Sequence, residues 1–298
     1  MLLVLGMHRS GTSAVAGTLA RLGIDFTEHL IAPAEDNPRG FFEHADVWRE
    51  DHALLEALGS DWDDPLPLPP DWLEAPATAQ TAARLRHILE RDFQGAGPFG
   101  IKDPRMCRLV PLWRQLLQSQ GYAAQAALVI RPPAQVIASL IRRDALTPAQ
   151  AAWMWLRHTV EAEAATRGLP RTVVPYERLL EDWQGEIDRM AQALALELPG
   201  RHDARVAADI AAFLAPELRH HRETVWPELD PTVLGWLQEV HAALSGDVID
   251  TATLDTVAAM LARFDRSNTA AAALLRQTRL QGAQLRALLA EQQEGNAW

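Results

Sequence analysis

The first 22 residues constrain the fold of this chain more than any other stretch. Leu2–Leu5 is a short apolar run typical of a buried parallel strand, residues 6–11 form a glycine-containing loop, and residues 14–22 have a helical pattern that Gly23 ends. A strand, a glycine loop and a helix N-terminus together bind anions, because free backbone N–H groups and the positive end of the helix dipole point at one place. The order of elements therefore predicts an α/β fold with an anion site near its N-terminus.

The loop departs from the common nucleotide-binding pattern at one position. Gly6 and Gly11 have the G-x-x-x-x-G spacing of a P-loop, but the lysine expected next is replaced by Thr12, with Ser13 after it. The positive charge lies inside the loop instead, on Arg9. Since the missing lysine grips the β- and γ-phosphates of a nucleoside triphosphate, this loop suits the phosphate of a different nucleotide. The alternative is a glycine-rich turn between strand and helix that binds no ligand.

Composition restricts the class of protein. With 298 residues, 48% of them hydrophobic, the chain can form one α/β unit followed by a tail, and we expect a domain at 1–265 and a helical or partly disordered tail at 266–298. No apolar run is long enough to span a membrane, and the N-terminus lacks the basic start of a signal peptide. The single cysteine, Cys107, excludes an internal disulfide, so a cytoplasmic location is expected. A net charge of −11 argues against nonspecific nucleic-acid binding.

The use of basic residues singles out one position. The chain has 28 Lys and Arg residues, and Lys102 is the only lysine among them. A position that keeps lysine where arginine is used elsewhere is one where a compact, mobile ammonium is needed and a planar guanidinium does not serve. The alternative is that one lysine remains by chance.

Three further apolar segments have the pattern of buried strands. They lie at residues 99–101, 126–130 and 172–174, and helical patterns separate them. Short apolar strands that alternate with helices predict a P-loop-type parallel sheet with helices on both faces, followed by a helical C-terminal region. Ligands bind at the carboxyl edge of such a sheet.

Basic residues follow three of these strands. Arg9, Lys102 and Arg131 each come directly after a predicted strand or in the loop behind it. We therefore expect them to gather at the carboxyl edge, where a locally cationic site can hold an anionic ligand despite the acidic net charge.

The remaining segments leave alternatives open. The proline-rich stretch at 63–76 either borders a substrate cleft or is a plain connector. The pair His220-His221 does not predict a metal site, because adjacent residues diverge on a helix and no cysteine or carboxylate pattern completes a ligand set. A weak leucine stripe in residues 267–298 fits a helix that packs on a partner, and self-association through it is an expectation.

Four motifs resemble one enzyme family. Residues 6–13 resemble the loop that binds the 5′-phosphosulfate in sulfotransferases that use 3′-phosphoadenosine 5′-phosphosulfate (PAPS), and residues 131–133 with Val136 and Ser139 resemble their 3′-phosphate signature. Lys102-Asp103-Pro104 is similar to a segment of tyrosylprotein sulfotransferases. In the same way, residues 37–43 are similar to a segment of bacterial relatives, some of which act on carbohydrates. The resemblance covers about the first 180 residues, in motif order.

The resemblance implies roles for particular residues. The 5′-phosphosulfate would lie against the first loop and the 3′-phosphate against the second signature, as in the set His8, Arg9, Ser10, Gly11, Thr12, Ser13, Arg131 and Ser139. Lys102, with Arg9, would stabilise charge on the bridging oxygen. Glu43 is the first candidate for the base that deprotonates the acceptor, with His44 and Asp46 in reserve.

The implied activity is transfer of a sulfuryl group from PAPS to a hydroxyl or amine of a carbohydrate, lipid or small metabolite. No metal is expected, because the sulfuryl group carries less charge than a γ-phosphoryl group. Two other interpretations remain: a small-molecule kinase, which should need lysine at position 12 and Mg²⁺, and a noncatalytic interaction protein with a nucleotide fold. Asp103 and Arg105 are expected to shape their turn rather than touch the reaction.

Overall fold

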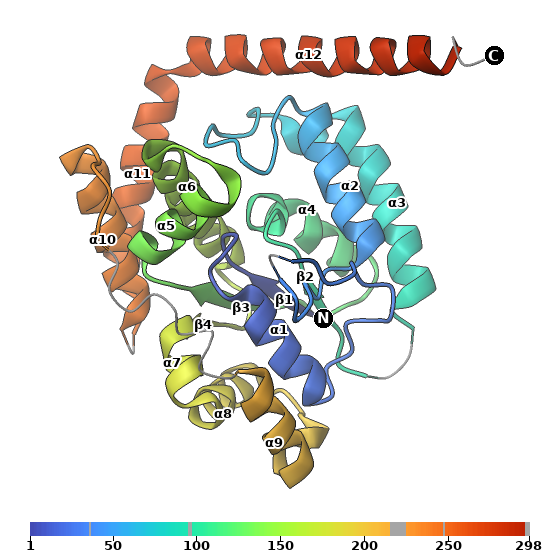
Figure 1. Ribbon diagram of the computed structural model, residues 1–298, viewed down its shortest axis with the longest axis vertical. Helices are drawn as coiled ribbons and strands as arrows, with labels where there is room; N and C mark the ends of the chain where they lie inside the picture. The colour runs from blue at the N-terminus through green and yellow to red at the C-terminus, as the bar shows by residue number, and fades with distance from the viewer. Residues whose placement is uncertain (36, 95–96, 215–224, 247, 296–298) are drawn as a thin grey trace.

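A computed structural model describes residues 1–35, 37–94, 97–214, 225–246 and 248–295, and its centre is a four-stranded sheet (Figure 1). All strand pairs are parallel and the strand order is β2-β1-β3-β4. The strands are β1 (Leu2–Leu5), β2 (Gly100–Lys102), β3 (Gln125–Ile130) and β4 (Arg171–Pro175). Each lies within a residue or two of its predicted place, and the predicted α/β fold class is confirmed.

The sheet is buried on both faces. Successive side chains of each strand point to opposite sides, so β1, β3 and β4 each contribute to a hydrophobic cluster on either face. In β1, Leu3 and Leu5 belong to one hydrophobic cluster, whereas Leu2 and Val4 belong to the other. Such continuous burial requires strands that are apolar at every position, as residues 2–5 are.

The smaller cluster joins the sheet to three helices, which lie below the sheet in Figure 1. These are α1 (Thr12–Arg21), α8 (Trp183–Leu194) and α9 (Ala204–Phe213), with the short α7 (Tyr176–Glu181) leading from β4. The larger cluster involves α2 (Ala45–Ala57), α3 (Pro76–Asp92), α4 (Met106–Ser119), α5 (Pro133–Asp144), α6 (Pro148–Thr166), α10 (Pro231–Ser245) and α11 (Thr251–Ser267). Two 3₁₀ turns, Trp72–Glu74 and Pro199–His202, complete this part of the chain.

One expectation about helices needs revision. The helix expected from Arg178 begins at Tyr176 and is divided in two, because Asp182 leaves helical geometry and caps α8 by accepting a hydrogen bond from the Gly185 N–H. The tail is one long helix, α12 (Thr269–Gly295), which Figure 1 shows running across the top of the molecule at an angle to α11. Its Leu274 and Leu285 are exposed, and self-association through them stays a prediction.

Among the residues that the structure describes, no helix is both long and apolar enough to cross a membrane. His220 and His221 lie outside the described ranges.

Candidate functional site

A cavity of about 490 Å³ opens at the carboxyl edge of the sheet. Arg9 from the loop after β1, Lys102 at the end of β2 and Arg131 after β3 all line it. The parallel topology brings these three cations together although more than a hundred residues separate the first from the last, as the strand pattern predicts.

The first loop adopts a conformation that leaves the start of α1 open to a ligand. Arg9 and Gly11 both have positive φ, 69° and 93°, and no side chain caps α1 at its N-cap, Gly11. Glycine is required there, since a Cβ would lie 2.1 Å from the ring of Tyr176. An uncapped helix N-terminus beside a cation is a suitable anion site.

The lone cysteine supports this loop. The Gly6 N–H donates a hydrogen bond to the Cys107 sulfur over 3.1 Å, inside the core. Burial raises the pKa of the Cys107 thiol to about 12, so the sulfur stays protonated and unreactive. At the same point a Cβ on Gly6 would meet the Val129 carbonyl oxygen at 2.5 Å, which explains the glycine. Cys107 is therefore structural.

A chain of contacts joins the two predicted phosphate signatures. The Arg9 side chain donates from Nε to Ser139 Oγ at 2.9 Å, and Arg131 Nη1 donates to the Arg9 carbonyl oxygen at 3.1 Å. Arg131 also donates from Nε to Gln135 at 2.9 Å and lies 4.9 Å above the centre of the Tyr176 ring. The structure therefore brings Arg9, Arg131 and Ser139 together; Arg9 and Arg131 line the cavity, whereas Ser139 is buried and does not line it.

A buried ion pair lies on the other side of the first loop. Lys102 Nζ donates to Glu43 Oε1 at 2.5 Å, to the Phe41 carbonyl oxygen at 3.0 Å and to Ser13 Oγ at 3.3 Å. Lys102 is 3% exposed and Glu43 is 6% exposed. Burial raises the pKa of the Glu43 carboxyl above its ordinary 4.5, and the charge of Lys102 opposes that rise. A carboxylate and an ammonium thus lie together at the N-terminus of α1, beside the Ser13 hydroxyl.

The local sequence explains how Glu43 reaches the cavity. It precedes His44, the N-cap of α2, so its carboxylate is free to turn inward rather than to interact with the first turn of that helix. His44 accepts hydrogen bonds on Nδ1 from the Asp46 and Val47 N–H groups, and its Nε2 lies 2.8 Å from Asp92. Both ring nitrogens of His44 therefore form contacts within the protein, one with the α2 backbone and one with Asp92.

Asp46, the other reserve base, lies in a surface ion cluster. It accepts hydrogen bonds from Arg49 and Arg91, each at 2.6 Å. The Arg91 guanidinium is the main cause that lowers the pKa of Asp46 to about 2. Neither His44 nor Asp46 lines the cavity, whereas Glu43 does.

The remaining predicted loop residues differ in their surroundings. Thr12 and Ser13 line the cavity, and Asn37 Nδ2 donates to Ser13 Oγ at 3.2 Å. Ser10 is buried and does not line the cavity; its backbone N–H donates to the Met7 carbonyl oxygen. The hydroxyl of Ser10 is thus separated from the ligand space.

His8 is turned toward the far end of the cavity. Its ring lies 4.9 Å from that of Trp62, and its Nε2 is buried without a hydrogen-bond partner among the described residues. Burial, together with the nearby charge of Arg105, lowers the pKa of His8 well below 6.5, so the imidazole is neutral. The side chain of His8 therefore forms part of an aromatic wall rather than a cationic phosphate contact.

Several lining residues escape prediction from sequence. They include Arg39, Trp48, Trp62, Arg143 and Tyr176. For Arg39, the only sequence signal is the resemblance of segment 37–43 to bacterial sulfotransferases. Its side chain donates a hydrogen bond to the Phe213 carbonyl oxygen. Asp103 accepts from the Arg105 N–H at 2.8 Å and from its Nη1 at 3.0 Å, and so shapes the turn, but Arg105 itself also lines the cavity.

No group of three or more His, Cys, Asp or Glu residues in the described ranges is arranged to hold a metal ion.

Comparison with known proteins gives matches among solved structures only. No protein family model matches the chain, and no curated protein matches it. The chain is similar in structure to bacterial sulfotransferase domains.

Three structures represent this likeness. The sulfotransferase domain of the olefin synthase of Synechococcus PCC 7002 has a TM-score of 0.49 and 17% identity over 81% of this chain and 94% of that one. The sulfotransferase domain of the curacin biosynthetic pathway has a TM-score of 0.46 and 14% identity, over 83% and 98%. Sulfotransferase STF9 of Mycobacterium avium has a TM-score of 0.44 and 18% identity, over 83% and 76%. Scores and identities this low carry no functional conclusion, which must come from the residues of the cavity.

Proposed function

We propose that this protein transfers a sulfuryl group from PAPS to a hydroxyl or amine of a carbohydrate, lipid or small-metabolite acceptor. The observation that carries the proposal is the buried Lys102–Glu43 pair, which lies beside Ser13 at the open N-terminus of α1. A general base and an ammonium next to an anion site are the groups that in-line sulfuryl transfer requires.

The donor nucleotide would occupy the cationic side of the cavity. PAPS carries phosphate groups at two positions of its ribose, so it needs two anion sites close together. The open start of α1, with the Thr12 and Ser13 side chains, suits the 5′-phosphosulfate. Arg131 and Ser139, which are linked through Arg9, suit the 3′-phosphate, because guanidinium groups form strong charge-assisted hydrogen bonds with phosphate.

Transfer then needs few protein groups. The Glu43 carboxylate takes the proton of the acceptor while the acceptor oxygen or nitrogen forms a bond to sulfur. The bond from sulfur to the bridging oxygen breaks, and 3′-phosphoadenosine 5′-phosphate (PAP) leaves. The Lys102 ammonium stabilises the negative charge that develops on the bridging oxygen. A raised pKa suits Glu43 to the role of base, because a more basic carboxylate accepts a proton more readily near neutral pH.

The proposal includes two conditions for activity. We expect transfer without a divalent metal, because the sulfuryl group carries less charge than a γ-phosphoryl group. We also expect the protein to act in the cytoplasm, since its one cysteine is a buried thiol that packs against the first loop.

A transfer assay with PAPS labelled in its sulfate tests the proposal. The full chain is incubated with panels of sugars, lipids and hydroxylated metabolites, once with EDTA and once with Mg²⁺. We expect label to move to at least one panel in both conditions, and Glu43→Gln to lower the rate of transfer at least about a hundredfold while leaving PAP binding intact. Failure to bind PAP, together with Mg²⁺-dependent turnover of ATP, would instead establish a kinase. Binding of PAP with no transfer to any panel would indicate a noncatalytic protein.

A further inference from the structure

The aromatic end of the cavity depends on a loop that has few backbone hydrogen bonds of its own. This proline-rich loop, residues 61–70, carries Trp62 into the cavity wall. Pro65, Pro67, Pro69 and Pro70 lack the backbone N–H, so the segment cannot form a regular ladder of backbone hydrogen bonds. Its carbonyl oxygens must therefore find donors elsewhere.

Two arginines from the core helices supply some of these donors. Arg108 of α4 donates to the carbonyl oxygens of Asp64, at 2.8 Å, and Leu66, at 2.5 Å. Arg157 of α6 donates from Nε to the Pro65 carbonyl oxygen at 2.9 Å. These contacts hold the inner side of the loop against the domain.

The tail helix supplies further contacts on the outer side. Arg276 of α12 donates to the Pro67 carbonyl oxygen at 2.7 Å, and Arg279 pairs with the Asp64 carboxylate at 3.2 Å. Asp64 is buried, and it also accepts from Ser60 Oγ at 2.9 Å and from the Leu66 N–H at 3.1 Å. The Arg279 contact thus acts on a carboxylate that already organises the turn of the loop.

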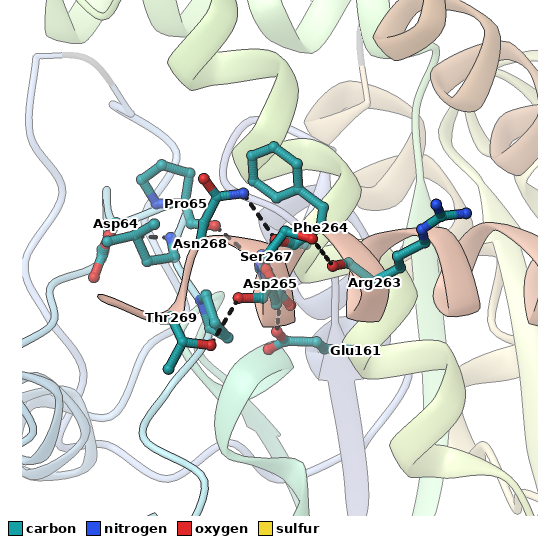
Figure 2. Close-up of polar contacts among 12 residues, drawn as sticks. Asp64, Pro65, Glu161, Arg263, Phe264, Asp265, Ser267, Asn268 and Thr269 are labelled. Atoms are coloured by element: carbon teal, nitrogen blue, oxygen red, sulfur yellow. Dashed lines mark hydrogen bonds and ion pairs between the residues drawn. The ribbon is translucent and has the colours of Figure 1, made fainter. Parts of the chain in front are cut away.

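The junction between α11 and α12 fixes the position of the tail helix. Asp265 at the end of α11 forms two hydrogen bonds with Arg157, both of 2.8 Å, so one guanidinium joins the junction to the loop. Figure 2 draws this junction together with Asp64 and Pro65 of the loop, and the Arg263 side chain points away from them. Asn268 ends α11 and donates to the Phe264 carbonyl oxygen, which sets the start of α12.

We propose that α12 is an intramolecular clamp and that Arg276 and Arg279 are positioning residues for Trp62. They hold the proline-rich loop from outside and so fix the wall of the cavity next to His8, without touching any ligand. The clamp itself is independent of the reaction; its effect on acceptor choice rests on the proposed function. Arg9, Arg131 and Ser139 contact one another, so the nucleotide end is expected not to depend on the clamp.

The test compares Arg276→Ala/Arg279→Ala with Arg263→Ala in the full chain by hydrogen–deuterium exchange. Arg263 is a matched control, an exposed arginine near the same junction that is turned away from the loop. We expect the amides of Asp64 and Leu66 to exchange about tenfold faster in the double variant, equivalent to about 1.4 kcal/mol, and at the wild-type rate in the control. Arg276→Lys/Arg279→Lys should restore most of the protection, because lysine can also donate to these oxygens.

A second readout follows Trp62 itself. With 5-fluorotryptophan incorporated, the ¹⁹F signal of Trp62 is assigned by its loss in Trp62→Phe. We expect that signal to shift in the double alanine variant while the signal of the core residue Trp113 and the affinity for PAP stay unchanged.

The clamp is overturned if loop exchange and the Trp62 signal are unchanged, or if exchange rises equally throughout the chain. If the double variant does not fold, each single alanine variant carries the same test with a smaller acceleration. If wild-type protein does not bind PAP, the proposed function fails, while the exchange result still decides the clamp.

Discussion

The two ends of the cavity are built in different ways. The cationic end consists of turns that directly follow three strands of the sheet, and its groups contact one another: Arg131 with Arg9, and Arg9 with Ser139. The aromatic end consists of Trp62 on a proline-rich loop that four arginines from three helices hold in place. Strand topology fixes the first end, whereas side-chain contacts between distant segments fix the second. Changes at the cationic end should therefore affect binding and chemistry directly, and changes at the aromatic end should affect specificity.

The largest effect is expected at the base. Glu43→Gln should lower the rate of transfer about 10²- to 10⁴-fold, the usual contribution of a general base, with PAP affinity retained. Glu43 acts when deprotonated, so wild-type activity should rise with pH through a pKa above the ordinary 4.5, and the variant should lack this rise. The pH–rate profile measures both. An acid limb that persists in Glu43→Gln would remove Glu43 from the mechanism.

The lysine should come next. Lys102→Met should lower transfer about 10²- to 10³-fold, because it removes the charge that stabilises the leaving oxygen. Lys102→Arg should recover little activity, since the buried site holds three acceptors, Glu43, Phe41 and Ser13, around one compact ammonium. Single-turnover kinetics with labelled PAPS give the rates. Full activity in Lys102→Arg would contradict the role given to the ammonium.

A smaller effect is expected at Ser139. Ser139→Ala should weaken PAP binding about fivefold, because Arg9 loses its hydrogen bond to Ser139, and one hydrogen bond contributes about 1 kcal/mol. Titration calorimetry measures the affinity. The exposed Arg86→Ala variant on α3 is a control that should bind PAP as the wild type does. An unchanged affinity in Ser139→Ala would separate Ser139 from the nucleotide site.

The smallest effect on nucleotide binding is expected at the opposite end. Trp62→Ala should change PAP affinity by less than about twofold, because Trp62 contacts the His8 ring and Arg143, and neither is among the groups proposed to hold the phosphates. With an acceptor found by the transfer screen, the KM for that acceptor should rise severalfold. A large loss of PAP affinity in Trp62→Ala would mean that the two ends are not separate.

The same contrast explains what sequence could predict. The four strands and the gathering of Arg9, Lys102 and Arg131 follow from apolar segments and parallel topology, which are local and general rules. The direction of His8 toward Trp62 could not be predicted, because it depends on a loop more than fifty residues away. The clamp could not be predicted from sequence either, because it joins Arg276 to the carbonyl oxygen of a residue 209 positions earlier. Sequence favoured Glu43 over His44, but only the capping contacts of His44 explain why.

The central claim is that one nucleotide with two phosphate groups spans the cationic end. Titration calorimetry with PAP and with adenosine 5′-phosphate, in the presence of EDTA, tests it in the wild type and in Arg131→Ala. We expect the wild type to prefer PAP and Arg131→Ala to lose about 30-fold of affinity for PAP, equivalent to about 2 kcal/mol, with little change for adenosine 5′-phosphate. Equal binding of the two nucleotides by the wild type, or an equal loss for both in Arg131→Ala, would contradict it.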